Sequence, residues 1–250
     1  AILSVDDLTP ENIEGDYLVM VTRRGIIKRT PLAEYSYQRR AGKIAVTLDE
    51  GDELIFVAHT HGDCDIMIAM ASGLAARFSE NRVSVVGRTA RGVRGVRLEP
   101  GDYVAGAVLI PRDEEWRRTH RLLTITENGF GKRLDEALFE NKGRGIKGMC
   151  CHKISEKTGA LVGIAAVTDD DDVMMITNGG LIIRMHCAGI PEYGRTASGV
   201  IVMRLSDGAS VVNFTVTAAA EDDDEPSAEA SADPADVSVE TTQDAAEPTE

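Results

Sequence analysis

Aromatic side chains are scarce in this sequence, since Phe, Tyr and Trp make up only 4% of its 250 residues. The hydrophobic core must therefore be built from Val, Ile, Leu, Ala and Met. No apolar run approaches the ~20 residues that a membrane-spanning helix requires, and the chain does not open with the charged and apolar regions of a signal peptide. The sequence thus predicts no contact with a membrane. Its length is enough for one large β domain or two smaller ones.

Cysteine is also infrequent, and the four cysteines form no C-x-x-C pair. They are Cys64, Cys150, Cys151 and Cys187. This arrangement gives no disulfide framework, which favours a reducing, cytoplasmic compartment.

Metal-ligating residue types come together in two short segments, His59-Thr-His61-Gly-Asp-Cys64 and Cys150-Cys151-His152. Neither segment has the paired spacing of a zinc site. Buried cysteines and surface histidines are the commoner explanation of such segments. The sequence therefore predicts no metal site.

Motifs of catalysis and nucleotide binding are missing as well. The sequence contains no G-x-S-x-G, and no histidine is placed by pattern beside a serine or cysteine. The phosphate-binding pattern G-x-x-x-x-G-K-[ST] does not occur either. By itself the chain is predicted to have no catalytic residues and no cofactor.

Basic residues are absent from the end of the chain, and the formal net charge of −14 is not spread evenly. Residues 221–250 hold 12 Asp or Glu and no Lys or Arg, so the body before them is nearly neutral. The composition predicts a disordered acidic tail over 218–250. Such a tail either keeps the protein soluble or competes with another polyanion for basic surface.

What the sequence does contain is a repeat with a period of about 50 residues. Each unit opens with a short apolar strand that ends in a turn glycine, and four residues after that glycine comes an arginine. The openings are Leu18–Gly25, Ile66–Gly73, Leu122–Gly129 and Val173–Gly180, and the arginines are Arg29, Arg77, Arg133 and Arg184. Because strand residues alternate between faces, these arginines are predicted to face outward, away from the core.

A second glycine follows later in each unit, within a loop that is basic in the first three units. These glycines are Gly42, Gly92, Gly145 and Gly199. A β-branched strand, such as Ile44–Leu48 or Val200–Leu205, comes next, then an acidic turn and a closing strand. The closing strands are predicted at Leu54–His59, Val104–Ile110, Leu161–Val167 and Val211–Val216.

Four strands per unit indicate an all-β array of blades, a pinwheel or propeller. The predicted blades span 17–65, 66–120, 121–172 and 173–217. Segments 30–38, 78–86 and 134–141 have room for one helical turn each. Residues 1–16 are predicted to hold the end of a preceding blade and a linker, because 1–7 resembles the closing strand and turn at 165–170. The chain is accordingly expected to be a fragment.

The most basic loop, Gly87–Leu98, contains four arginines and three glycines. Arginine forks fit phosphate oxygens, and glycine lets the backbone come close to a ligand. An isolated stretch of this kind would be a solvated basic hairpin, but its recurrence in the repeat favours a polyanion-binding surface. The candidate polyanion-binding residues, which the resemblance described next makes candidate DNA-binding residues, are Lys28, Arg29, Arg39, Arg40, Lys43, Arg77, Arg88, Arg91, Arg94, Arg97, Lys132, Arg133, Lys142, Arg144, Lys147, Arg184, Arg195 and Arg204.

The repeated units resemble the C-terminal domain of DNA gyrase A, the six-bladed β-pinwheel of a bacterial type IIA topoisomerase. The resemblance rests on Thr89–Leu98 and Thr196–Leu205 within the blade pattern. It implies four blades similar to the third to sixth of the family. Residues Gln38–Ile44 resemble the family's QRRGGKG-like box, but they lack two of its glycines and lie in a later blade.

This resemblance implies that the basic rim wraps duplex DNA, so that the whole enzyme introduces negative supercoils. It implies as partners the rest of gyrase A as a homodimer and gyrase B in a heterotetramer, with ATP and Mg used elsewhere in the enzyme. It also places the protein at the nucleoid. Two alternatives stay open: the equivalent domain of topoisomerase IV, and a propeller-like scaffold whose basic loops bind an acidic protein.

Overall fold

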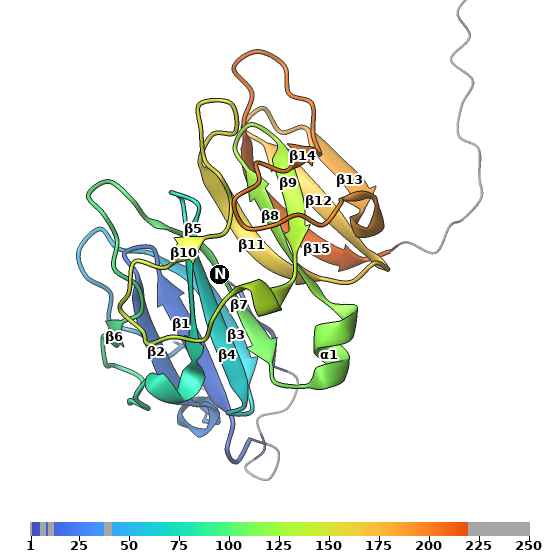
Figure 1. The fold of residues 1–250 in the computed structure, drawn as a ribbon. Helices are drawn as coiled ribbons and strands as arrows, with labels where there is room; N and C mark the ends of the chain where they lie inside the picture. The colour runs from blue at the N-terminus through green and yellow to red at the C-terminus, as the bar shows by residue number, and fades with distance from the viewer. Residues whose placement is uncertain (1, 6–8, 10–12, 38–41, 220–250) are drawn as a thin grey trace, which may run out of the picture. The chain divides into compact units, whose positions relative to one another are not determined.

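The computed structural model describes residues 2–5, 9, 13–37 and 42–219 of the chain (Figure 1). Residues Ala1–Ala219 form one compact unit, and Ala220–Glu250 make up the rest of the chain. The predicted acidic tail therefore lies, apart from its first two residues, outside the described residues. Residues 2–5 form no strand, so the strand expected at 1–7 is wrong for the part that the structure describes.

The compact unit is built from four antiparallel sheets, which confirms the all-β pinwheel of repeated blades. Each sheet places the opening strand between a closing strand and a middle strand. The opening strands are β1 (Tyr17–Thr22), β4 (Cys64–Met70), β8 (Arg121–Thr126) and β12 (Asp171–Thr177). The middle strands are β2 (Ile26–Pro31), β5 (Leu74–Ser79), β9 (Phe130–Leu134) and β13 (Ile182–His186). The closing strands are β3 (Leu54–Thr60), β7 (Val104–Pro111), β11 (Leu161–Val167) and β15 (Val211–Ala218).

The fourth strand of a blade comes from the following unit, which the sequence did not predict. Two-residue strands β6 (Val93–Arg94), β10 (Met149–Cys150) and β14 (Val200–Ile201) pair with β2, β5 and β9 of the preceding blade. The fourth sheet has three strands. The strand expected at 44–48 is absent, and the one expected at 200–205 shrinks to β14.

Glycine contacts show how the units interlock and correct one assignment. A Cβ on the turn glycine Gly129, whose φ is +74°, would lie 2.2 Å from the carbonyl oxygen of Met203 in the next unit. In the third unit the second glycine is Gly148 rather than Gly145. A Cβ on Gly148 would lie 2.5 Å from the carbonyl oxygen of Ala75, whereas Gly145 has open space. Only glycine lets these segments approach so closely.

Short helical turns join the strands. Three of them, η1 (Leu32–Tyr35), η2 (Glu80–Arg82) and η3 (Glu136–Leu138), confirm the turns expected within 30–38, 78–86 and 134–141. The fourth unit adds η4 (Cys187–Gly189), and α1 (Glu114–Thr119) lies between β7 and β8. Among the described residues, no helix is long and apolar enough to span a membrane.

Three of the four hydrophobic clusters lie between successive blades, and the fourth lies within the first unit. Ile68 packs in a cluster with Val19 and Ile27 of the first blade, while its neighbour Met67 packs in a cluster with Leu122 of the third. Successive strand residues point to opposite faces, so both faces of a blade are buried against its neighbours. A side chain on either face can therefore be buried.

Candidate nucleic-acid interface

The arginines four residues after the turn glycines do not all face outward, so this prediction is wrong for three of the four. Arg29, Arg77 and Arg133 are 6–8% exposed. Each lies on a middle strand whose outward side is covered by the next unit. We call these residues, together with Arg184 in the fourth blade, the blade arginines.

Arg77 shows the contacts most fully. Its guanidinium lies 2.9 Å from a carboxylate oxygen of Asp65 on the neighbouring strand β4. It also pairs with the carboxylate of Glu136 and donates hydrogen bonds to the carbonyl oxygens of Glu136 (3.0 Å) and Phe139 (3.1 Å), all in the third unit. Burial alone would raise the pKa of Asp65, but its hydrogen bonds and the Arg77 charge lower it overall. Arg77 thus joins the second blade to the third.

The other buried blade arginines make similar contacts with different partners. Arg29 donates to Asn81 (3.0 Å) and lies 3.6 Å from Glu80, both in the next unit. Its guanidinium also stacks on the ring of Tyr17, which occupies the place of Asp65 on the opening strand. Arg133 donates to the carbonyl oxygen of Ile190 at 2.5 Å.

Arg133 also pairs with Asp169. Arg184 differs from the other three, because the described chain holds no following blade. Its side chain is 39% exposed and pairs with Asp172 at 2.5 Å.

Two lysines in the candidate set are buried as well. The ammonium of Lys132 donates to the carbonyl oxygens of Gly194, Arg195 and Ala197, each at 2.8 Å. Burial lowers the pKa of Lys132 to about 8. Through these hydrogen bonds Lys132 holds residues 194–197 of the fourth unit in place.

Lys28 holds the loop of the second unit in a similar way. It donates to the carbonyl oxygen of Ala45 (2.8 Å) and to that of Arg88. Burial, with a smaller effect of the Arg88 charge, lowers the pKa of Lys28 to about 8. Neither buried lysine can reach a ligand at the surface.

The basic loops of successive units touch one another. We call residues 42–49, 87–97, 142–153 and 194–199 the rim loops. Arg88 donates to the carbonyl oxygen of Ile44 at 2.6 Å, and Gly145 donates to Gly95 at 2.6 Å. The third and fourth rim loops meet where the backbone N–H of Lys153 donates to Ala197 at 3.2 Å. Segments that are about 50 residues apart in the sequence therefore form one continuous strip.

Exposed cations lie along this strip. Among the described residues, the guanidinium groups of Arg94, Arg97, Arg195 and Arg204 form no hydrogen bond or ion pair. Arg144 donates only to the backbone carbonyls of Arg82 (2.9 Å) and Arg94 (3.2 Å), so its charge is not neutralised by an acid. Arg204 follows β14, five residues after the fourth rim loop ends.

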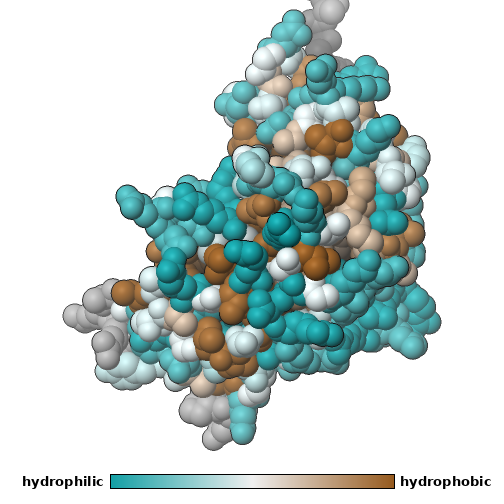
Figure 2. Space-filling view, turned by 60° about the vertical axis from the view of Figure 1, so that its left-hand side comes forward, coloured by the Kyte–Doolittle hydropathy of each residue, from teal (hydrophilic) through white to brown (hydrophobic). Residues whose placement is uncertain are grey.

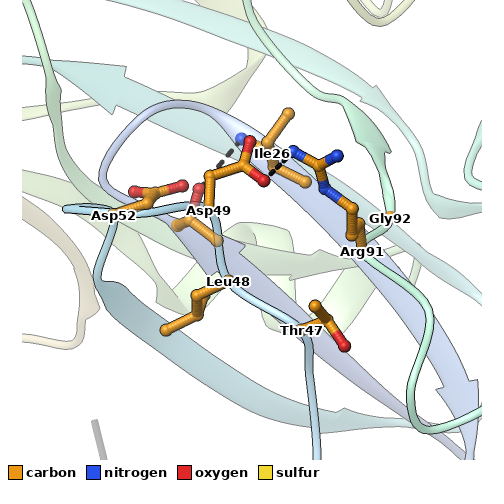
Figure 3. Close-up of a pocket in the computed structure, with 8 residues that line it drawn as sticks. Ile26, Thr47, Leu48, Asp49, Asp52, Arg91 and Gly92 are labelled. Carbon is orange, nitrogen blue, oxygen red and sulfur yellow. Dashed lines mark hydrogen bonds and ion pairs between the residues drawn. The ribbon is translucent and has the colours of Figure 1, made fainter.

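Other strip residues have acidic partners. Arg91 pairs with Asp49 across a hollow of about 250 Å³, and Figure 3 shows the guanidinium facing the carboxylate. Lys142 and Lys147 pair with Glu140 and Glu99 respectively. Such exposed pairs are weak because water screens them, so a phosphate could replace the acid at small cost.

The remaining candidates are Lys43, Arg88, Arg39 and Arg40. The ammonium of Lys43 donates to the carbonyl oxygen of Glu34 at 3.3 Å, and Arg88 is half-buried near Glu34. Arg39 and Arg40 lie outside the described residues. Figure 2 brings the β6 side of the molecule forward and shows hydrophilic side chains over much of it, with hydrophobic patches between them.

Comparison with known proteins agrees with this architecture. Residues 16–61, 65–111, 120–168 and 171–218 each match the family described as DNA gyrase C-terminal domain, beta-propeller. DNA gyrase A of Staphylococcus epidermidis is 41% identical over 223 residues, and that of Escherichia coli K12 is 39% identical over 201 residues. These alignments cover 89% and 80% of this chain but only 24% and 22% of those relatives.

Solved structures show the same fold. A DNA gyrase A C-terminal domain superposes with a TM-score of 0.71 at 26% identity, covering 84% of this chain and 67% of that one. The C-terminal domain of a DNA topoisomerase IV superposes with a TM-score of 0.77 at 24% identity, covering 86% and 65%. Through its four matched repeats and its gyrase relatives, the chain belongs to the DNA gyrase C-terminal β-propeller family.

Proposed function

We propose that this chain binds and bends duplex DNA along its rim loops as the C-terminal part of DNA gyrase A. The observation that carries the proposal is the continuous strip, in which loops from all four units are joined by hydrogen bonds and present unpaired guanidinium groups. Phosphate contacts supply most of the affinity of such a surface and carry no sequence information. DNA that follows a curved row of blades must bend, so its flexibility matters more than the identity of its bases.

In this proposal the burial of the blade arginines narrows the set of phosphate ligands. Arg94, Arg97, Arg144, Arg195 and Arg204 are the primary contacts. Lys43, Arg88, Arg91, Lys142 and Lys147 contribute where phosphate displaces a local partner. The buried candidates stabilise the fold and do not contact phosphate: Arg29, Arg77, Arg133, Lys28 and Lys132. Arg184 contacts mainly its own blade.

A salt titration of DNA binding tests the strip directly. Replacing both Arg94 and Arg97 with Ala should weaken binding to all duplex sequences about equally. It should also reduce the slope of log K against log salt by about 0.9 for each lost phosphate contact, hence by about 1.8. The matched control replaces Arg118 on α1, whose guanidinium forms no hydrogen bond or ion pair within the described residues, and is compared with Arg94→Ala alone. An unchanged slope in the Arg94/Arg97 variant, or an equal change in the control, would refute the assignment.

Bending is tested by topology. Ligation of nicked circular DNA with the chain bound should shift the linking number of the closed circles. Binding without such a shift would show that the chain holds DNA without wrapping it.

The whole enzyme carries the rest of the proposed function. We expect the chain to act with the remainder of gyrase A as a homodimer and with gyrase B, in the bacterial cytoplasm. ATP and Mg would be used outside this part of the protein, and the chain itself would catalyse no step. In the intact enzyme, ATP-dependent negative supercoiling of relaxed plasmid is the result expected for gyrase. Relaxation alone would favour a topoisomerase IV.

A further inference from the structure

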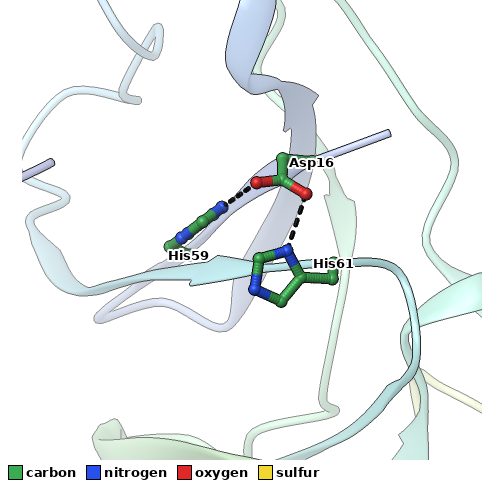
Figure 4. Close-up of side chains that lie close together, drawn as sticks. All are labelled: Asp16, His59 and His61. Carbon is green, nitrogen blue, oxygen red and sulfur yellow. Dashed lines mark hydrogen bonds and ion pairs between the residues drawn. The ribbon is translucent and has the colours of Figure 1, made fainter. Parts of the chain in front are cut away.

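A cluster of two histidines and one aspartate lies at one end of the first blade. His59 is on β3, His61 follows the end of that strand, and Asp16 directly precedes β1 (Figure 4). His59 Nε2 lies 2.6 Å from one carboxylate oxygen of Asp16, and His61 Nδ1 lies 2.7 Å from the other. One potential ligand atom from each residue lies within 4.8 Å of the others.

The backbone holds these three side chains in place. His59 pairs opposite Leu18, the second residue of β1, so the end of β3 lies beside the start of β1. Residues 59 and 61 share one face because strand side chains alternate. The carbonyl oxygen of Asp16 accepts a 2.8 Å hydrogen bond from the N–H of Leu32, which fixes Asp16 from the opposite side.

Asp16 is the buried member of the cluster and contacts both histidines. The side chain of Asp16 is only 9% exposed, and within the described residues its sole ion-pair partners are the two imidazoles. No lysine or arginine of the described chain pairs with it.

The ligand types select the class of metal. Two imidazoles and one carboxylate suit Zn²⁺ and similar divalent transition metals, whereas Mg²⁺ and Ca²⁺ prefer oxygen ligands. The side chain of His61 is 80% exposed, so an ion can enter and water can complete the coordination. The present N···O separations are hydrogen-bond lengths. Shifts of several tenths of an ångström would open them for a metal at roughly 2.0–2.2 Å from each ligand.

We propose that Asp16, His59 and His61 form a binding site for one divalent transition-metal ion, of which Zn²⁺ is the typical member. The metal replaces the protons that the imidazoles share with the carboxylate. It ties the end of β3 to the start of β1. Binding therefore stabilises the first blade and does not depend on DNA.

The test uses the full 250-residue chain without a histidine tag, treated with a chelator that is then removed. Titration with Zn²⁺ should show one saturable site, and Co²⁺ should give the visible absorption of a nitrogen- and oxygen-ligated ion. His61→Ala should weaken Zn²⁺ binding at least tenfold, because a ligand is lost from an exposed position outside the hydrophobic core. Lowering the pH from 7 to 5.5 should also weaken binding, since protons compete for both imidazoles.

His186→Ala provides the matched control. His186 also lies beside a buried carboxylate, Asp172, but without a second histidine, so its loss should leave Zn²⁺ affinity unchanged. Zn²⁺ should raise the melting temperature of the wild type and the His186 variant but not that of the His61 variant. Absence of a one-to-one site, or equal affinity in the wild type and the His61 variant, would overturn the proposal.

Discussion

Replacing Arg77 with Met should destabilise the junction of the second and third blades without directly weakening DNA binding. The change keeps most of the aliphatic stem but removes the guanidinium that pairs with Asp65 and Glu136. Breaking a buried ion pair by removing one partner costs about 3–5 kcal/mol. Here both carboxylates keep a second arginine, Arg112 at 3.1 Å from Asp65 and Arg117 at 3.3 Å from Glu136. We therefore expect a loss near the lower limit, about 3 kcal/mol.

Urea and thermal denaturation followed by circular dichroism measure this loss. For a domain of roughly 200 residues, 3 kcal/mol corresponds to a fall in Tm of about 6–12 °C. Arg94→Met is the matched control, because its exposed guanidinium has no partner in the described chain, and it should change stability by no more than about 0.5 kcal/mol. Hydrogen exchange should locate the loosening of Arg77→Met at β5 and η3.

DNA binding by the folded Arg77 variant decides between the two roles of this arginine. The salt slope should stay that of the wild type, while Arg94→Met lowers it by about 0.9. If Arg77→Met instead kept full stability and lowered the salt slope, Arg77 would be a phosphate ligand and the inter-blade role would be refuted.

Three further predictions concern acid, glycine and the tail. Burial lowers the pKa of His152 to about 4, below the ~6.5 of an unfolded histidine, so the folded state binds fewer protons between these values and becomes less stable as the pH falls through this window. In urea titrations, the wild type should lose about 2.5 kcal/mol more between pH 7 and pH 4.5 than His152→Gln loses. Equal losses would contradict this. Gly129→Ala should lower Tm much more than Gly180→Ala. Both glycines have positive φ, but only at Gly129 would the new Cβ lie 2.2 Å from a carbonyl oxygen, that of Met203. Equal effects would show that the contact with Met203 does not matter. Deleting 221–250 should tighten DNA binding several-fold below ~0.1 M salt if the acidic tail competes for the rim loops, whereas unchanged affinity would leave the tail a solubilising role.

Local patterns predicted the opening and closing strands well. A short apolar run bounded by a turn glycine is enough to specify such a strand, as Leu122–Gly129 illustrates with β8. The fourth strands could not be predicted in the same way. They are two residues long and form only by pairing with the preceding unit, so no periodicity inside their own segment reveals them.

The outward placement of the blade arginines failed for a different reason. The alternation of faces is real, but the inference assumed that one face of the blade meets water. In the middle blades both faces pack against other blades, so a cation on either face of them needs an acid. One signal was present in the sequence: Glu80 and Glu136 each come three residues after a blade arginine. In the structure each of these glutamates pairs with the blade arginine of the preceding unit.

The cluster of Asp16, His59 and His61 shows why the spacing of residues in the sequence did not reveal the proposed metal site. His59 and His61 were visible as an H-x-H pair, but their third partner, Asp16, lies more than 40 residues earlier in the chain. Cys64, the nearer candidate ligand, is not part of the cluster. Only the pairing of β1 with β3 brings Asp16 to the histidines.

Buried and exposed basic residues contribute to two different properties, stability and DNA affinity, which the sequence alone does not distinguish. Arg77 is neutralised by buried acids and Arg133 by the exposed Asp169, so both add little to the field at the surface. Arg94 and Arg97 keep their charge free at the rim loops, where a phosphate can reach it. Stability and DNA affinity therefore depend on different arginines of the same repeat. Substitutions in one set should change the unfolding free energy, and substitutions in the other set should change the salt dependence of DNA binding.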